Sequence, residues 1–277
     1  MAMVEQDRAA WLEERKTGIG ASEAAAALGV NPYKSPMELW AEKCGLTEPP
    51  DLSENEAAEF GVRLEPVIAE AFAARTGRRV ELWPQDKIVR STEHVWMICT
   101  PDATQQCDGD GNAVGVLQIK TANEFLSSAW KDGPPLHYQV QCQHELTVTG
   151  CDWGTLVVLI GGQKLRYFDF EANPKFQAAL IGRLGNFWEA IETRTPPEID
   201  ASLSTARILE KLHPMDNGES VALPEEALQW DADLKGAKAK VKDLEELIRD
   251  RENRIKAAVG DCTFGVLPDG GRFSWKH

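Results

Sequence analysis

Polar side chains near the middle of the chain have the types and spacing to bind a divalent metal ion and act on a phosphodiester. Asp102 follows a Thr-Pro dipeptide, and Gln118 and Lys120 flank Ile119. Because side chains alternate along a strand, positions 118 and 120 would share one face while Ile119 turns into the core. Asp102 and Gln118 could then hold a cation, and Lys120 could orient an attacking water or stabilise the charge on a phosphorane. Magnesium suits such an oxygen-rich site, and manganese could substitute for it.

This pattern is weak evidence by itself, because an acidic residue followed at a distance by x-x-Lys is a short pattern of common residues that often arises by chance. Taken alone, Asp102 is compatible with a simple turn and Lys120 with a solvated strand end. The elements around them and a wider resemblance decide between these interpretations.

The first 200 residues contain several sequence signals for the start and end of helices. Ser22 has the position of an N-cap before an alanine-rich helix that ends at Gly29. Pro66 lies inside a longer helix that ends at Gly77, and we expect it to kink or restart that helix. Further helices are expected over residues 36–45, 136–149 and 174–192.

Strand signals alternate with these helices. Apolar and β-branched segments predict strands at 80–83, 95–99, 114–120, 155–160 and 164–170. A turn is expected at 108–112, and a Gly161-Gly162 hairpin turn between the last two strands. The alternation predicts an α/β fold in which helices flank a mixed central sheet.

The last part of the chain differs in character. After residue 200 we expect a polar linker, a long helix from about Leu223 to Ala258, and a small terminal hairpin. Gly236 is a weak point in that helix. Its apolar residues lie near heptad spacing and predict packing on the core or on a neighbouring subunit: Trp230, Leu234, Val241, Leu244, Ile248 and Ile255.

Composition limits the classes of protein that remain. The 277 residues carry a net charge of −14, which argues against coating nucleic acid by bulk attraction but leaves room for a metal-dependent DNA enzyme. The six cysteines include no C-x-x-C pair, so we expect reduced thiols rather than zinc or disulfides. Since neither a signal peptide nor a membrane-spanning run is recognised, we expect a cytoplasmic protein of a bacterial host cell.

Several motifs in order along residues 8 to 195 resemble the YqaJ-like viral recombinases and the phage lambda-type exonucleases, which belong to the PD-(D/E)XK nuclease superfamily. The motifs are Trp11-x-x-x-Arg15-x-x-Gly18-Ile19-Gly20-Ala21-Ser22-Glu23, Asn31-Pro32-Tyr33-x-Ser35-Pro36-x-Glu38-Leu39-Trp40, Gly61-x-x-x-Glu65-Pro66, Thr100-Pro101-Asp102, Gln118-x-Lys120 and Gln139-Val140-Gln141-Cys142-Gln143.

The resemblance implies roles at the start of the chain. Arg15 and Ser22 would bind the 5′-phosphate of the strand being cut, where a guanidinium fork and a hydroxyl are suitable donors. The alternatives are a surface ion pair for Arg15 and a plain helix cap for Ser22. Trp11, one helical turn before Arg15, could stack near the DNA end, but we expect core packing for it.

The resemblance also implies that Glu65 completes the metal site from a helix and that Gln141 lies near the scissile nucleotide. Gln139 and Gln143 leave that assignment ambiguous by two residues. One departure matters: the family has glutamate at the position of Gln118, and a glutamine brings no negative charge to a cation. Gln118 is either a natural variant or a deliberate replacement, and the sequence leaves both open.

Together these features predict a restriction-endonuclease-like nuclease core over residues 1–200 and an extension over 201–277. The resemblance implies a metal-dependent exonuclease that digests double-stranded DNA, 5′ to 3′, for a single-strand annealing protein, and that assembles as a ring-shaped homotrimer. A structure-specific endonuclease and a catalytically silent DNA-end-binding module are the alternatives, and Gln118 supports the second.

Overall fold

The computed structural model describes residues 5–51, 54–107 and 114–274. It divides into two compact units, Met1–Met215 and Asp216–His277. The sequence-based boundary lay at residue 200, whereas the first unit extends to Met215. The difference is α7 (Leu203–Leu212), which falls in the segment predicted to be linker and packs with α3 (Pro36–Lys43). The hydroxyl of Ser204 in α7 accepts a hydrogen bond of 2.8 Å from the Ser35 amide at the start of α3.

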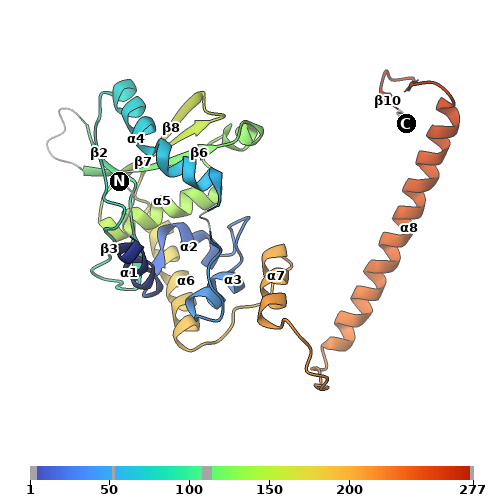
Figure 1. Ribbon diagram of the computed structural model, residues 1–277, viewed down its shortest axis with the longest axis horizontal. Helices are drawn as coiled ribbons and strands as arrows, with labels where there is room; N and C mark the ends of the chain where they lie inside the picture. Colours follow the sequence, from blue (N-terminus) through green and yellow to red (C-terminus); the bar gives the residue numbers. More distant parts are fainter. Residues whose placement is uncertain (1–4, 52–53, 108–113, 275–277) are drawn as a thin grey trace. The chain divides into compact units, whose positions relative to one another are not determined.

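A five-stranded mixed sheet in the order β2-β5-β6-β7-β8 organises the first unit (Figure 1). Its central strands β6 and β7 are parallel, and the other neighbours are antiparallel. This arrangement confirms the predicted α/β class. The strands are β2 (Arg79–Leu82), β5 (Ala103–Gln106), β6 (Val114–Ala122), β7 (Trp153–Ile160) and β8 (Lys164–Glu171).

Strand β5 was not predicted from the sequence. Its residues Ala-Thr-Gln-Gln lack apolar alternation, yet Gln105 is fully buried. The Gln105 amide donates to the carbonyl of Val116 and to the hydroxyl of Thr155, both at 2.8 Å. Those tertiary partners make a polar strand compatible with the interior.

Helices cover both faces of this sheet. On one face, Phe72 and neighbouring residues of α4 (Glu56–Thr76) pack against Leu117 and Ile119 of β6. On the other, Cys142 of α5 (Leu136–Thr149) packs against alternate residues of β7. The predicted inward turn of Ile119 is therefore confirmed, and Gln118 faces the α5 side.

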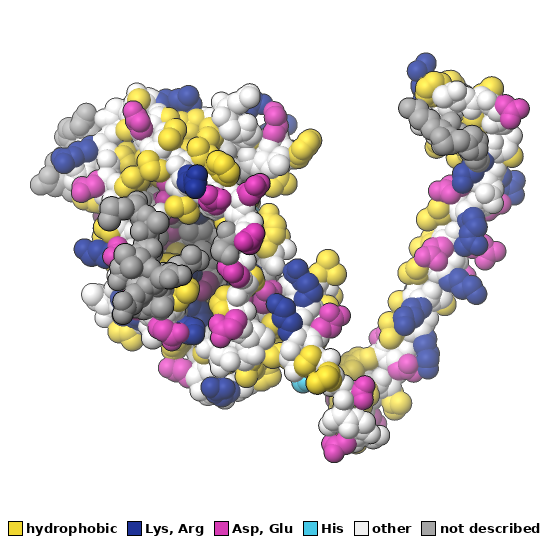
Figure 2. Space-filling model, viewed as in Figure 1, with side chains coloured by type: hydrophobic (Ala, Val, Ile, Leu, Met, Phe, Trp, Pro, Cys, Tyr) yellow, Lys and Arg dark blue, Asp and Glu magenta, His cyan; other side chains and the backbone are white. Residues whose placement is uncertain are grey.

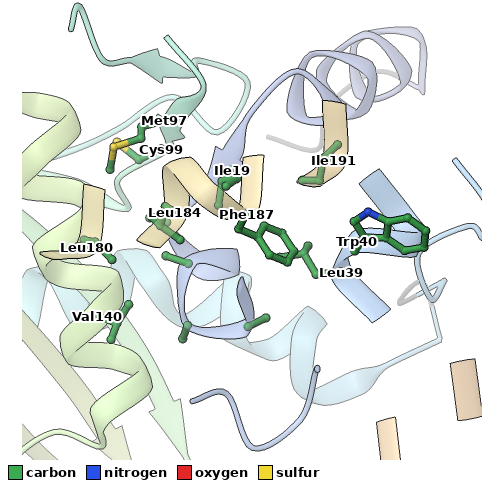
Figure 3. Packing of buried hydrophobic residues seen from close by; sticks show 14 of the residues in the cluster. Ile19, Leu39, Trp40, Met97, Cys99, Val140, Leu180, Leu184, Phe187 and Ile191 are labelled. Carbon is green, nitrogen blue, oxygen red and sulfur yellow. The ribbon is translucent and has the colours of Figure 1, made fainter. Parts of the chain in front are cut away.

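A second apolar core lies around α2 (Ala21–Ala27), α3 and α6 (Pro174–Glu192). Leu184 and Phe187 of α6 lie close to Ile19 and Leu39 there (Figure 3). Trp40 donates its indole N–H to the carbonyl of Ala190 at 3.1 Å. This core attaches the N-terminal motifs to the helices behind the sheet.

A small sheet connects the N-terminal motif to the segment before Asp102. Strand β1 (Ile19–Gly20) runs parallel to β4 (Met97–Cys99), which also pairs with β3 (Val89–Arg90). The Ile19 amide donates to the Trp96 carbonyl at 2.7 Å. A Cβ at Gly18 would approach that same oxygen to 2.8 Å, so only glycine permits this pairing.

The structure corrects several local predictions. Helix α2 begins at Ala21 with Gly20 as its N-cap, so Ser22 lies in the first turn rather than at the cap. Helix α4 continues without interruption through Pro66. The expected strand at 95–99 is only 97–99. The predicted turn at 108–112 lies outside the described residues.

The second unit consists of α8 (Ala227–Val259) and a hairpin of β9 (Phe264–Val266) and β10 (Arg272–Ser274). Gly236 does not interrupt α8, and the hairpin returns so that Gly265 lies against Val259. The long helix and terminal hairpin are confirmed over these bounds. Among the described helices, none is long and apolar enough to cross a membrane.

Candidate active site

Asp102 and Gln118 are brought together by the pairing of β5 with β6. Ala103 lies opposite Leu117, so the residue before β5 faces residue 118. Oδ2 of Asp102 accepts a hydrogen bond from Nε2 of Gln118 and one of 2.6 Å from the Ile119 amide. The two expected ligands are therefore in direct contact.

The contact between Asp102 and Gln118 is buried. Burial raises the pKa of Asp102, although the Lys120 charge and the Ile119 amide act in the opposite direction. Gln118 is 1% exposed, and within the described part of the chain its Oε1 has no hydrogen-bond partner. This unpaired carbonyl oxygen lies beside a buried carboxylate, where it could accept a hydrogen bond or bind a cation.

Glu65 approaches the same place from α4. Burial and the Asp102 charge raise the pKa of Glu65 to about 7, against the opposing effects of Gln85 and Lys120. Nε2 of Gln85 donates to Oε2 of Glu65 at 3.3 Å. Lys120 lies close enough to lower the pKa values of both acids, and its Nζ is 5.7 Å from the Tyr138 ring centroid. Four of the five residues predicted as catalytic are therefore linked: Gln118 bonds to Asp102, and the charges of Glu65 and Lys120 act on or with that of Asp102.

The three glutamines of α5, at positions 139, 141 and 143, differ in their contacts. Gln139 donates to the Pro134 carbonyl at 2.6 Å, and Gln143 donates to the Glu171 carbonyl at 2.8 Å. Both therefore stabilise local structure. Gln141 instead lines a pocket and donates to Oε1 of Glu145 at 3.0 Å.

Glu145 was not predicted for the site. It is fully buried, and its Oε2 has no hydrogen-bond partner among the residues that the structure describes. Burial and the Asp102 charge raise its pKa to about 8. Its position one helical turn after Gln141 was the available signal, because residues four apart share a helix face. His144, which we left out of the site, is buried in the core, with Nε2 3.1 Å from the Ile98 carbonyl oxygen.

Arg15 and Ser22 meet at the end of α1 (Glu5–Lys16). Nη2 of Arg15 lies 3.5 Å from Oγ of Ser22 and 3.3 Å from Oε1 of Glu23. The guanidinium carbon is 4.8 Å from the centroid of the Trp11 ring. Trp11 is half-buried, with its Nε1 covered, and its ring lies against Arg15.

A buried ion pair holds Arg15 in place. Nζ of Lys43 lies 2.8 Å from Oε2 of Glu23 and donates to the carbonyls of Arg15 and Gly18, both at 2.7 Å. Burial acts to raise the pKa of Glu23, but Lys43 and Arg15 outweigh it, so that pKa is lowered. Neither Glu23 nor Lys43 was predicted to contribute, because the pairing joins α2 to α3.

One pocket is shared by residues of the N-terminal motif and polar residues of α5. Its wall combines the donors of the N-terminal motif, the segment before Asp102 and the polar residues of α5: Arg15, Gly20, Ala21, Ser22, Ile88, Ile98, Cys99, Thr100, Gln141 and Glu145. The pocket places a guanidinium and a hydroxyl beside the amide of Gln141. This combination of donors suits a phosphate group.

The donor set near Asp102 is compatible with a hard cation. Asp102, Glu65 and the unpaired Oε1 of Gln118 are oxygen donors of the kind magnesium prefers. Within the part of the chain that the structure describes, however, no group of three or more His, Cys, Asp or Glu side chains could hold a metal ion. A glutamate at position 118 would add an acid in direct contact with Asp102.

The pattern of the YqaJ-like viral recombinase domain matches residues 10–152 of this chain. The chain belongs to that family. Its similarity to a Bacillus subtilis (strain 168) protein extends further: YqaJ, described as uncharacterised, is 29% identical over 268 residues, covering 95% of this chain and 82% of YqaJ.

The fold of this YqaJ-like chain is also similar to solved structures. An alkaline exonuclease from Laribacter hongkongensis matches with a TM-score of 0.56 and 18% identity, covering 75% of this chain and 100% of the exonuclease. The same enzyme in complex with dAMP matches with a TM-score of 0.55 at equal identity and coverage. At this identity the similarity establishes the fold, which agrees with the predicted PD-(D/E)XK class.

Proposed function

We propose that this YqaJ-like chain is a magnesium-dependent deoxyribonuclease that digests double-stranded DNA from its ends, 5′ to 3′, in phage or prophage recombination. The observation that carries the proposal is the pocket that unites Arg15 and Ser22 with Gln141, beside the buried contact of Asp102 and Gln118. A phosphate-binding group next to an acidic cluster is what cleavage near a 5′ terminus requires.

Each side chain has a proposed role. Arg15 and Ser22 bind the terminal phosphate, and Gln141 positions the nucleotide next to it. Asp102, Glu65 and Gln118 hold the cation, and Lys120 orients water or stabilises charge on the phosphorus. When bound, magnesium or manganese would polarise the phosphodiester and lower the pKa of a water ligand.

The proposed 5′ to 3′ direction rests on the family resemblance, which implies that Arg15 and Ser22 bind a 5′-phosphate. A site that holds a 5′-phosphate beside the cleaving groups favours strands whose 5′ end is free. The related fold of an alkaline exonuclease, also solved with dAMP, supports an exonuclease that releases nucleotides. The annealing-protein partner, the ring-shaped trimer and the cytoplasmic site of action are proposals that rest on the family resemblance.

The decisive experiment compares linear and covalently closed circular duplex DNA in magnesium. We expect the linear DNA to be degraded and the circle to stay intact, with 5′-end label released before 3′-end label. Cutting of the circle would favour a structure-specific endonuclease and overturn the exonuclease proposal. Earlier release of 3′-end label would overturn only the direction.

The second candidate is a catalytically silent DNA-end-binding protein. The observation that favours it is the absence, among described residues, of three acids able to hold a metal ion. It predicts that linear DNA is bound at its ends but not digested at any magnesium or manganese concentration. Digestion by the unchanged protein excludes it.

A further inference from the structure

We propose that helix α8 pairs with α8 of a second copy of this chain as a parallel, two-stranded coiled coil. The helix is 33 residues long and ends at Val259, and the small hairpin that follows it packs against Val259. In Figure 2, hydrophobic side chains follow one side of it, with charged side chains beside them. A stripe of this kind is stable only when another surface covers it.

The spacing of the stripe is that of a heptad repeat. Intervals of four and three residues run along the helix and place alternating a and d positions on one seam. The a positions are Leu234, Val241, Ile248 and Ile255, and the d positions are Trp230, Ala237, Leu244, Arg251 and Ala258. About four heptads are therefore in register, enough for a stable seam.

These seam residues are exposed within their own unit. Trp230 is 60% exposed, Val241 53%, and Leu244 and Ile248 57% each. In the second unit as described, only the C-terminal end of α8 is covered, by the hairpin at Val259. The central part of the seam is thus available to a partner helix.

The identity of the seam residues indicates two strands. Val241, Ile248 and Ile255 are β-branched residues at a, and Leu244 is the one leucine at d, where Trp230, Ala237 and Ala258 also lie. That combination favours parallel dimers, because the side chains at a and d meet the partner helix at different angles. Arg251 is the polar exception at d, and its guanidinium is already paired with Asp250 at 2.6 Å.

Charges on either side of the seam identify the partner as another α8. In a parallel pair, each g residue faces the e residue of the next heptad on the other helix. Asp233 at g then faces Lys238 of the second copy, and Lys240 faces Glu245. Both contacts are attractive and occur twice by symmetry. Residues five apart do not meet on one helix, so the complementarity has no use within a single chain.

This pairing is separate from any association of the nuclease units. If those units are single, pairing gives a dimer, and if they form rings of three, pairing joins two rings. In either case disruption of the seam should halve the mass of the assembly. This makes the inference testable without knowing the state of the first unit.

The first test uses cysteine cross-linking in the full chain. The exposed Cys262 is replaced by serine, and Leu244→Cys at d is compared with Glu246→Cys, which points outward at f. Under mild oxidation we expect Leu244→Cys to give a covalent dimer in at least about tenfold higher yield, because d residues meet in register in a parallel pair. Equal yields from the two variants would overturn the proposal, because residues at f do not meet in a seam formed by a and d. Leu244 lies near the middle of α8, so Trp230→Cys near its start tests the direction of the helices: only a parallel pair brings residue 230 of both chains together, and failure of that variant to cross-link would overturn the parallel arrangement.

The second test uses charge. Lys240→Glu places like charges opposite Glu245, and we expect the dissociation constant of the pairing to rise roughly fivefold. Adding Glu245→Lys should restore it, a rescue that a merely structural effect would not produce. Light scattering on Val241→Glu should give half the mass of the unchanged protein. An unchanged mass in that variant, together with a lower melting temperature of the nuclease unit, would mean that α8 packs on its own core and would refute the inference.

Discussion

The side-chain amide of Gln118 donates a hydrogen bond to the carboxylate of Asp102 in the buried contact between β5 and β6. The amide thereby supplies the positive partner that a buried carboxylate needs. A glutamate at position 118 would instead place two acids in contact, and a bound cation or a shared proton would then be needed to offset their repulsion. With glutamine rather than glutamate at this contact, we expect weak binding of a metal ion.

The first prediction is that Gln118→Glu tightens magnesium and manganese binding and raises the rate of linear DNA digestion by at least about tenfold, or roughly 1.4 kcal/mol in barrier. Calorimetric titration and a time course on end-labelled duplex would measure the two effects. Gln118→Leu is the matched control, because it keeps the size of the side chain and removes its oxygen. If the leucine variant equals the unchanged protein in both measurements, Gln118 is not a ligand.

Arg15→Ala should abolish most of the preference for 5′-phosphate over 5′-hydroxyl ends. One charge-assisted hydrogen bond contributes roughly 1.5–3 kcal/mol, so the preference should fall about tenfold or more. Digestion rates of the two kinds of linear DNA give the measurement. Arg90→Ala is the control, since Arg90 bonds to Thr17 at 2.8 Å near the same motif but lies outside the pocket. Equal rates on both ends in the unchanged protein would contradict the assignment.

Gln141→Ala should slow digestion roughly tenfold, the cost of about one lost hydrogen bond to the nucleotide. Gln143→Ala, two residues further along the same helix, should leave the rate unchanged below its melting temperature. That second variant instead loses bonds to the Glu171 carbonyl and the Asn173 amide, so it should lower stability by about 1 kcal/mol. Comparable loss of activity in both variants would argue against a special role for Gln141.

Glu145→Gln should stabilise the metal-free protein at high pH. The folded state raises the pKa of Glu145 to about 8, so between its ordinary value of 4.5 and about 8 it keeps a proton that the unfolded chain releases. The free energy of unfolding therefore falls as pH rises through that window. Glutamine lacks this titration.

Denaturant unfolding in EDTA at pH 5 and pH 9 would measure the difference. We expect the two proteins to be similar at pH 5 and the glutamine variant to be at least about 2 kcal/mol more stable at pH 9, since each pKa unit corresponds to about 1.4 kcal/mol. Glu65 is present in both proteins, so its own raised pKa does not affect the comparison. A pH-independent gap would show that Glu145 does not titrate in the window.

Truncation after Asp216 should leave the nuclease site formed, because the first compact unit ends at Met215. We expect the shortened chain to digest linear DNA at a rate within about twofold of the full chain while its assembly mass falls. Light scattering and the digestion assay check both outcomes. Loss of digestion with an intact circular dichroism spectrum would mean that the second unit contributes to the site.

The sequence by itself determined the features that depend on local pattern. Strand alternation correctly assigned Ile119 to the core and Gln118 to the opposite face, and the bounds of α5 and α6 agree with those expected. The ordered motifs were sufficient to indicate the family, because each retains its own short-range spacing. Heptad intervals likewise marked α8 in advance.

Only the tertiary structure decided which side chains share a pocket. It separated Gln141 from Gln139 and Gln143, added Glu145, and joined Glu23 to Lys43. Strand β5 and helix α7 were not predicted from the sequence, because they are stabilised by residues far away along the chain. Periodicity records which face of an element is buried, but not which distant residues bury it. Hydrogen bonding and charge pairing in the interior depend on those distant neighbours, and for that reason the sequence named candidate site residues but not the full set that shares the pocket.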